Sequence, residues 1–160
     1  TLSRSSAASD VYKRQHGNMG GVVSVVGSES PRITENIAVT GNIDVTGEVI
    51  ADKAYIAETT LTDQATITWD MSSQSVSKVT LAGNRTMAAP TNGSTGQFCS
   101  ILVIQDGTGS RTLTWNAVFE FASDTAPTLT TTANLGDLFT FRYNGSKWLE
   151  VGRNQALTLS

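Results

Sequence analysis

The sequence has few of the residues that build disulfides, metal sites and hydrolytic active sites. Its 160 residues include one cysteine, Cys99, and one histidine, His16. A single cysteine can form neither a disulfide within the chain nor the set of thiolates that a structural zinc ion requires. A hydrolytic triad needs a base beside its nucleophile, and His16 stands alone in a glycine-rich stretch. We therefore expect no catalytic residues, no metal and no cofactor.

Charge and long apolar runs are also scarce. Charged residues make up 16% of the chain, against about 25% in typical proteins, while serine and threonine are abundant. Since the longest apolar run, residues 101–104, is only as long as a strand, we expect no membrane span. This composition is typical of a β-rich protein whose surface is solvated by hydroxyl and amide groups.

Residues 1–15 differ in kind from the rest. Residues 5–15 read SSAASDVYKRQ, which resembles the translation of a transposase-type sequencing adapter. We expect a disordered artefact here, a biological sequence that begins near His16, and a fragment of a longer protein; the alternative is a disordered, mildly basic arm. Without residues 1–15 the net charge falls from −3 to −5. An acidic chain argues against a nucleic-acid partner, because phosphate binding needs clustered lysine and arginine.

A hexad repeat follows a Gly-, Val- and Ser-rich stretch, residues 16–32, that we interpret as a linker or shaft remnant. Residues 36–41 (NIAVTG) and 42–47 (NIDVTG) are nearly identical, and residues 48–56 continue the pattern loosely. Aliphatic residues alternate with polar ones, as in a strand with one buried face. Because such short strands cannot bury that face alone, we predict that residues 33–60 form a β stalk shared in a homotrimer. The alternative is a β-meander packed on the following domain.

From residue 61 onward the pattern predicts longer strands. Residues 97–105 are the most apolar stretch and predict a central strand covered on both sides. Asp106 to Ser110 is predicted to turn the chain into a hairpin with residues 113–115. The clearest hairpin joins residues 138–143 to residues 147–151 through Asn144-Gly145, which suits a tight turn with positive φ angles.

About eight short strands and no segment of helical period predict the fold class. We expect an all-β, antiparallel β-sandwich, jelly-roll-like, over residues 61–152, with a C-terminal tail at residues 153–160. The aromatic residues are expected to form most of its core: Trp69, Trp115, Phe119, Phe121, Phe139, Phe141 and Trp148.

Residues around the last turn form one candidate binding surface. Tyr143 and Trp148 could stack on a sugar ring, while Asn144 and Lys147 hold its hydroxyl groups. The strand pattern nevertheless favours a core position for Trp148.

A second candidate is the loop between Asp106 and Arg111. Its glycines and hydroxyls could form an anion-binding nest or a weak calcium site, but an ordinary turn is the favoured interpretation. The acids Asp70, Asp106, Glu120 and Asp124 could in principle pair for glycoside cleavage, and their spacing supports no pair.

Several blocks of sequence resemble one family. Residues 105–115 (QDGTGSRTLTW) follow residues 81–87 (LAGNRTM) and 90–92 (PTN), and precede residues 126–129 (APTL) and 141–148 (FRYNGSKW). In this order they are similar to modules that end the tail fibres and related virion appendages of tailed bacteriophages, over residues 60–152. The resemblance implies a homotrimeric, extracellular structural protein of the virion. Its terminal domain would contact a host-surface glycan or protein, or lock the end of the trimer.

We therefore predict the distal module of a phage tail fibre, with other virion proteins and a host-surface glycan or protein as partners. Three weak sites on one shaft would gain avidity. Two alternatives remain open: a capsid head fibre or decoration protein, and the accessory domain of a tailspike-like glycan depolymerase whose catalytic part lies upstream.

Overall fold

The computed structural model describes residues 43 and 45–159. The predictions for residues 1–15, residues 16–32 and the first hexad of the stalk lie outside the described residues. The chain divides into two units, residues 1–50 and residues 51–160. In the first unit the described residues form no strand, and Ile43, Val45, Val49 and Ile50 are exposed. Across the described ranges, no helix has the length and apolar character needed to cross a bilayer.

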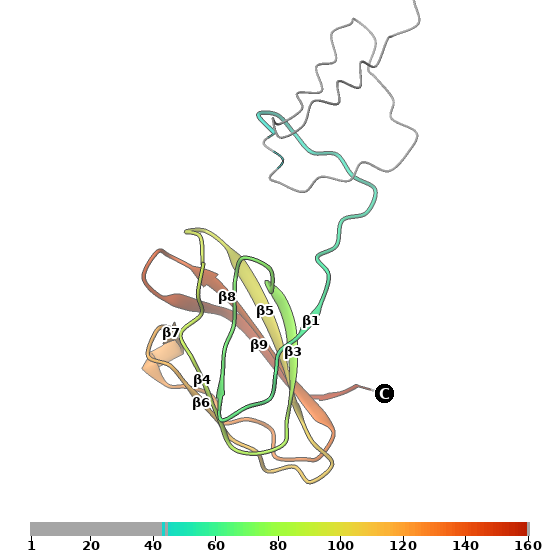
Figure 1. Ribbon diagram of the computed structural model, residues 1–160, viewed down its shortest axis with the longest axis vertical. Coiled ribbons are helices and arrows are strands. Elements are labelled where there is room, and N and C mark those ends of the chain that lie inside the picture. Colours follow the sequence, from blue (N-terminus) through green and yellow to red (C-terminus); the bar gives the residue numbers. More distant parts are fainter. Residues whose placement is uncertain (1–42, 44, 160) are drawn as a thin grey trace, which may run out of the picture. The chain divides into compact units, whose positions relative to one another are not determined.

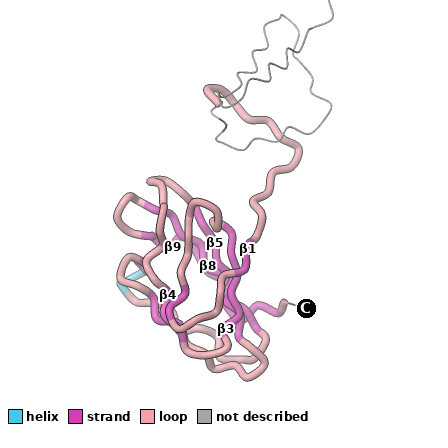
Figure 2. The backbone as a smooth tube through the Cα atoms, in the orientation of Figure 1, coloured by secondary structure: helices cyan, strands magenta, loops and turns pink. Residues whose placement is uncertain are grey.

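The second unit is built from strands in two sheets (Figure 1). The larger sheet is mixed and curled, with the order β1 (Thr59–Thr60), β3 (Val76–Leu81), β5 (Phe98–Gln105), β8 (Leu135–Tyr143), β9 (Trp148–Thr158) and β7 (Phe119–Glu120). The smaller sheet has the order β2 (Thr66–Ile67), β4 (Arg85–Met87) and β6 (Leu113–Trp115). Among the described residues the only helix is a 3₁₀ turn, η1 (Ala122–Asp124), shown in cyan in Figure 2. The mostly-β prediction is confirmed.

The direction of the strands corrects the prediction of an antiparallel, jelly-roll-like sandwich. From β1 to β6 the chain alternates between the two sheets, and one strand in each sheet makes one circuit. From β3 to β6, each strand therefore pairs in parallel with the strand that occupies the same sheet one circuit earlier. In the larger sheet Thr59 pairs with Ser77, and Ser77 pairs with Ile101. Of the pairings between described strands, only β5 with β8 and β8 with β9 are antiparallel. Alternation in the sequence specifies the buried face of a strand, and a crossing to the opposite sheet buries the same residues as a hairpin does.

The turn after β5 shows this difference. The predicted hairpin with residues 113–115 is wrong, because β6 crosses to the smaller sheet and pairs with β4, where Leu113 lies opposite Arg85. Buried Gln105 stabilises the crossing. Its Nε2 donates to the carbonyl of Arg111 over 2.9 Å, and its Oε1 accepts from the Arg111 amide over 2.8 Å.

The hairpin between β8 and β9 is confirmed, but its turn is longer than a two-residue type. Tyr143 pairs with Trp148, so four residues connect the strands. Of the turn residues only Gly145 has a positive φ, of 97°. The Asn144 side chain instead closes the turn, since its Oδ1 accepts from the amides of Ser146 and Lys147 over 2.9 and 2.7 Å.

Aromatic side chains join the two sheets, as predicted. Six of the seven expected residues are buried, and Trp115 is partly buried against them. Trp115, in the smaller sheet, lies with its ring centroid 5.1 Å from Phe139 and 5.6 Å from Phe141 in the larger sheet. Burial of each large apolar side chain contributes about 1.5–3 kcal/mol, so this cluster dominates the core.

Strand β5 occupies the third position of the larger sheet, which confirms a central strand. It is fully buried on one face only, the face of Cys99, Ile101 and Val103. On the other face Phe98 is 56% exposed and the remaining side chains are half-buried. The expectation of complete cover on both sides was therefore wrong.

Candidate functional site

The residues predicted to hold a sugar at the last hairpin are engaged in the fold. Trp148 is buried, in agreement with the core interpretation, and Tyr143 stacks on it with ring centroids 4.6 Å apart. The Tyr143 hydroxyl donates to the Gly145 carbonyl over 3.0 Å. Lys147 reaches across to the β7 side, where its Nζ donates to the Ala117 carbonyl over 2.6 Å. A binding role for these residues stays a prediction.

The Asp106 loop has the geometry of a self-contained turn. Arg111 grips the carboxylate of Asp106 with an Nη2–Oδ2 distance of 2.8 Å, and the amides of Thr108 and Gly109 donate to Oδ1. The hydrogen bonds from Arg111, with help from the two amides, lower the pKa of Asp106 from 3.8 to about 2. A calcium ion would have to displace Arg111 from this carboxylate, which favours the turn interpretation.

These two predicted surfaces are far apart along the larger sheet. Phe98 of β5 pairs with Arg142, beside the last hairpin, whereas Ile104, beside Asp106, pairs with Gly136 at the opposite end of β8. The fold thus does not bring Asp106 and Arg111 together with Tyr143, Asn144, Lys147 and Trp148. Within the described ranges, no group of three or more His, Cys, Asp or Glu residues is placed to hold a metal ion. Burial of Cys99 raises the pKa of its thiol to about 12, so this side chain stays protonated.

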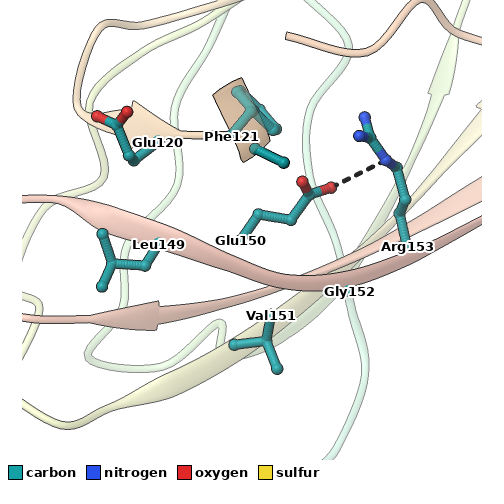
Figure 3. A pocket seen from close by; sticks show the side chains of 8 residues that line it. Glu120, Phe121, Leu149, Glu150, Val151, Gly152 and Arg153 are labelled. Atoms are coloured by element: carbon teal, nitrogen blue, oxygen red, sulfur yellow. Dashed lines mark ion pairs between the residues drawn. The ribbon is translucent and has the colours of Figure 1, made fainter. Parts of the chain in front are cut away.

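A different site opens where β7 leaves β9. Strand β7 pairs with β9 only at Trp148 and Leu149, and the chain then departs through η1. Beyond that point lies an open hollow of about 400 Å³, lined by residues 120–122 and 149–153 (Figure 3). We call it the β7–β9 hollow. Its volume falls within the range of small-ligand sites, roughly 300–1,000 Å³.

Two charged side chains of β9 meet in the β7–β9 hollow. Glu150 and Arg153 lie on one side of the strand, and Val151 points to the other side (Figure 3). The Arg153 Nε lies 3.3 Å from Glu150 Oε1, yet within the described structure that oxygen accepts no hydrogen bond. The Glu150 side chain is only 8% exposed. A carboxylate oxygen that is buried without a hydrogen bond is costly and calls for an explanation.

The rim of the hollow is linked to the last hairpin. Glu120 forms an ion pair with Lys147, with an Oε2–Nζ distance of 3.3 Å, and both side chains are well exposed. Phe121 is buried behind the rim, where its ring meets that of Trp115 edge to face at 5.5 Å. The charges around the hollow are therefore balanced in two pairs, Glu120 with Lys147 and Glu150 with Arg153.

The sequence of the chain matches a known family of phage domains. Residues 30–148 match the family described as "Putative phage tail fibre C-terminal domain". The chain belongs to this family. The matched segment covers the tail fibre domain from β1 to the start of β9, and it confirms the resemblance found in the sequence. No curated protein matches the chain.

Sequence reasoning missed the two β9 residues of this tail fibre domain. Glu120 was considered only as a candidate acid, and neither Glu150 nor Arg153 was singled out. One sign was present: in a strand that buries Trp148, the alternation of side chains places Glu150 on the same face. An inward-facing carboxylate at the edge of a sheet is a reason to look for a binding site.

Proposed function

We propose that this chain is the distal module of a phage tail fibre, which trimerises through its N-terminal stalk and contributes to attachment at the host cell surface. In this proposal residues 16–32 form a linker and residues 33–60 a shared β stalk. Residues 61–152 form the head, and its last strand, β9, continues through most of the predicted C-terminal tail, residues 153–160, as far as Thr158. The module resides in the tail of the virion, with other virion proteins as partners, and its role is structural rather than catalytic. The family supports this role.

The apolar side chains of the stalk carry the proposal. In a single chain the exposed fractions reach 72% for Ile43, 74% for Val49 and 89% for Ile50. Tyr55 and Ile56 are also largely exposed. A run of exposed aliphatic residues at strand period is an interaction surface, and a closed ring of identical chains covers it without leaving an open end. Association in threes then gives three head domains that act together on a repetitive surface.

The absolute mass in solution tests this. We expect light scattering coupled to size exclusion to give three times 16.9 kDa for the full chain, and three times its own, lower chain mass for the chain without residues 1–15. Replacement of Ile43, Val45 and Val49 by asparagine should yield a monomer whose head remains folded. The matched control, Glu48→Gln with Asp52→Asn, changes exposed polar positions of the same segment and should remain trimeric. A stable monomer of the unmodified chain at all concentrations would refute the shared stalk.

Attachment is tested with the same proteins. Fluorescently labelled trimer should bind host cells more tightly than the asparagine monomer, by about 10²–10⁴-fold if several sites engage at once. Equal binding by trimer and monomer would contradict multivalent attachment. The same comparison separates the alternatives, because a capsid decoration protein has no need of host-cell binding.

A further inference from the structure

Among the described residues, Glu150 is the one acid with a buried carboxylate oxygen that accepts no hydrogen bond. Its side chain is more than nine-tenths buried, and its Oε1 accepts no hydrogen bond among the described residues. By contrast, the buried Asp137 accepts hydrogen bonds on both oxygens. A buried carboxylate without donors is destabilising, so Glu150 has unused capacity to accept a hydrogen bond from a ligand.

Arg153 supplies hydrogen-bond donors beside the Glu150 carboxylate. Its Nε lies 3.3 Å from Glu150 Oε1, and its side chain is 30% exposed at the mouth of the hollow. A guanidinium carries five N–H donors, and no hydrogen bond from it to another described residue accompanies this ion pair. An acceptor and several donors therefore stand side by side at the edge of a space of about 400 Å³.

The charges of the site favour a neutral ligand. Glu150 faces Arg153, and Glu120 faces Lys147, so neither an anion nor a cation meets a surplus of opposite charge. A hydroxyl group both donates and accepts a hydrogen bond, and two neighbouring hydroxyls can serve a carboxylate and a guanidinium together.

We propose that the β7–β9 hollow binds a neutral saccharide unit, whose hydroxyls donate to Glu150 and accept from Arg153. The proposal rests on the proposed function, since host-surface glycans are the source of such a ligand. It names a site on the head that is distinct from the stalk and from the Asp106 loop. Lys147, predicted from the sequence as a sugar-binding residue, contributes indirectly by neutralising Glu120.

Saturation-transfer NMR on the full chain tests the site. The probes are the methyl glycosides of glucose, galactose, mannose and N-acetylglucosamine, each titrated separately, with glucuronate as the charged counterpart. At least one glycoside should give a saturable signal, and Glu150→Gln or Arg153→Gln should weaken its binding by about tenfold, the expected effect of losing one charge-assisted hydrogen bond. The matched control is Glu58→Gln, which breaks the exposed ion pair with Lys78 and should leave binding unchanged.

Three results would overturn the proposal: no saturable signal with any neutral probe, binding of glucuronate alone, or unchanged affinity in both hollow variants. Arg153→Gln alters an exposed end of the pair, so it keeps the test valid if Glu150→Gln fails to fold. The outcomes also separate this inference from the proposed function. A trimer that adheres to cells but binds no glycoside would contradict saccharide binding in the β7–β9 hollow and leave the proposed function intact. Glutamate-dependent glycoside binding by a chain that neither trimerises nor adheres contradicts the proposed function alone.

Discussion

Substitution of Asp137 should destabilise the head more than most substitutions, because its carboxylate accepts hydrogen bonds both from a β-bulge and from a neighbouring loop. The register between β8 and β9 shifts between Gly136 and Leu138, and Ala156 has a positive φ of 57°. The Ala156 amide donates to Asp137 Oδ1 over 3.0 Å. The Thr130 amide and hydroxyl donate to the two carboxylate oxygens over 2.7 Å each. This single side chain thus ties residue 130 to both strands.

The magnitude follows from the donors that a truncation would leave behind. In Asp137→Ala the Thr130 amide loses its partner, at a cost of about 1–3 kcal/mol for a buried, unsatisfied donor. The Ala156 amide keeps the Thr130 hydroxyl, 3.0 Å away, so it loses only about 1 kcal/mol. We expect a total destabilisation of about 3 kcal/mol, or a Tm lower by about 12 °C for a domain of this size. In Asp137→Asn the amide group can donate to the Thr130 hydroxyl while Oδ1 keeps the Thr130 amide, so about 1 kcal/mol is expected.

Urea unfolding at one fixed protein concentration measures these differences, since association shifts apparent stability. Asp124→Asn is the matched control, because Asp124 is exposed and its side chain forms no hydrogen bond in the described part of the chain. The expected order of stability is wild type and Asp124→Asn, then Asp137→Asn, then Asp137→Ala. An Asp137→Ala protein within about 0.5 kcal/mol of wild type, the range of an ordinary surface substitution, would refute this account of the bulge.

Three further outcomes are expected. Gly109→Ala should destabilise the head by at least about 1 kcal/mol, because Gly109 has a φ of 74° and a Cβ there would lie 2.5 Å from the Thr131 carbonyl oxygen. A Cβ at Gly107 would meet nothing within 4 Å, so Gly107→Ala should be tolerated. Equal effects of the two substitutions in urea unfolding would contradict this. Cys99, with its pKa raised to about 12, should resist a disulfide reagent at pH 8 until the chain is unfolded; rapid labelling of the native protein would show an accessible thiol. Asp106 has a folded pKa of about 2, below its usual 3.8, so its stabilising contribution is present above pH 4 and is lost as the pH falls towards 2. In Arg111→Gln the NMR titration midpoint of Asp106 should rise towards 3.8, and an unchanged midpoint would argue against the ion pair as its main cause.

The sequence predicted the buried face of each strand better than the partner of each strand. The alternation around Trp69, Phe139 and Phe141 identified core residues because burial depends on side-chain period alone. Strand pairing depends on where the chain goes after a turn. The Asn144-Gly145 turn is local, so its hairpin was found. The Asp106 loop looked equally like a hairpin, and only the contacts of Gln105 with Arg111 show that the chain crosses to the other sheet.

The candidate site was harder to predict, because Glu150 differs from other acids only in that the fold buries its carboxylate without a hydrogen bond to Oε1. Glu150 in the sequence is an ordinary acid between two aliphatic residues. It becomes unusual once β7 ends at Glu120 and leaves the β9 edge open, with Arg153 too poorly aligned to donate to Oε1. The reverse holds for Tyr143 and Trp148. Their aromatic rings suggested stacking on a sugar, but in the structure the two rings stack on each other and Trp148 belongs to the core.

The alternation of the chain between its two sheets gives the head a direction of growth. In the part of the chain from β1 to β6, each circuit adds one strand to each sheet, and that strand pairs with the strand of the circuit before it. Ser77, for example, pairs with Thr59 of the circuit before and with Ile101 of the circuit after. In such a stack the stability of a late layer depends on the layers already in place. The crossings between layers lie outside the strand registers, so extra residues inserted at a crossing would extend the rim and leave the pairing beneath it intact. A head of this kind can diversify its outer loops repeatedly while the coil that carries them stays the same.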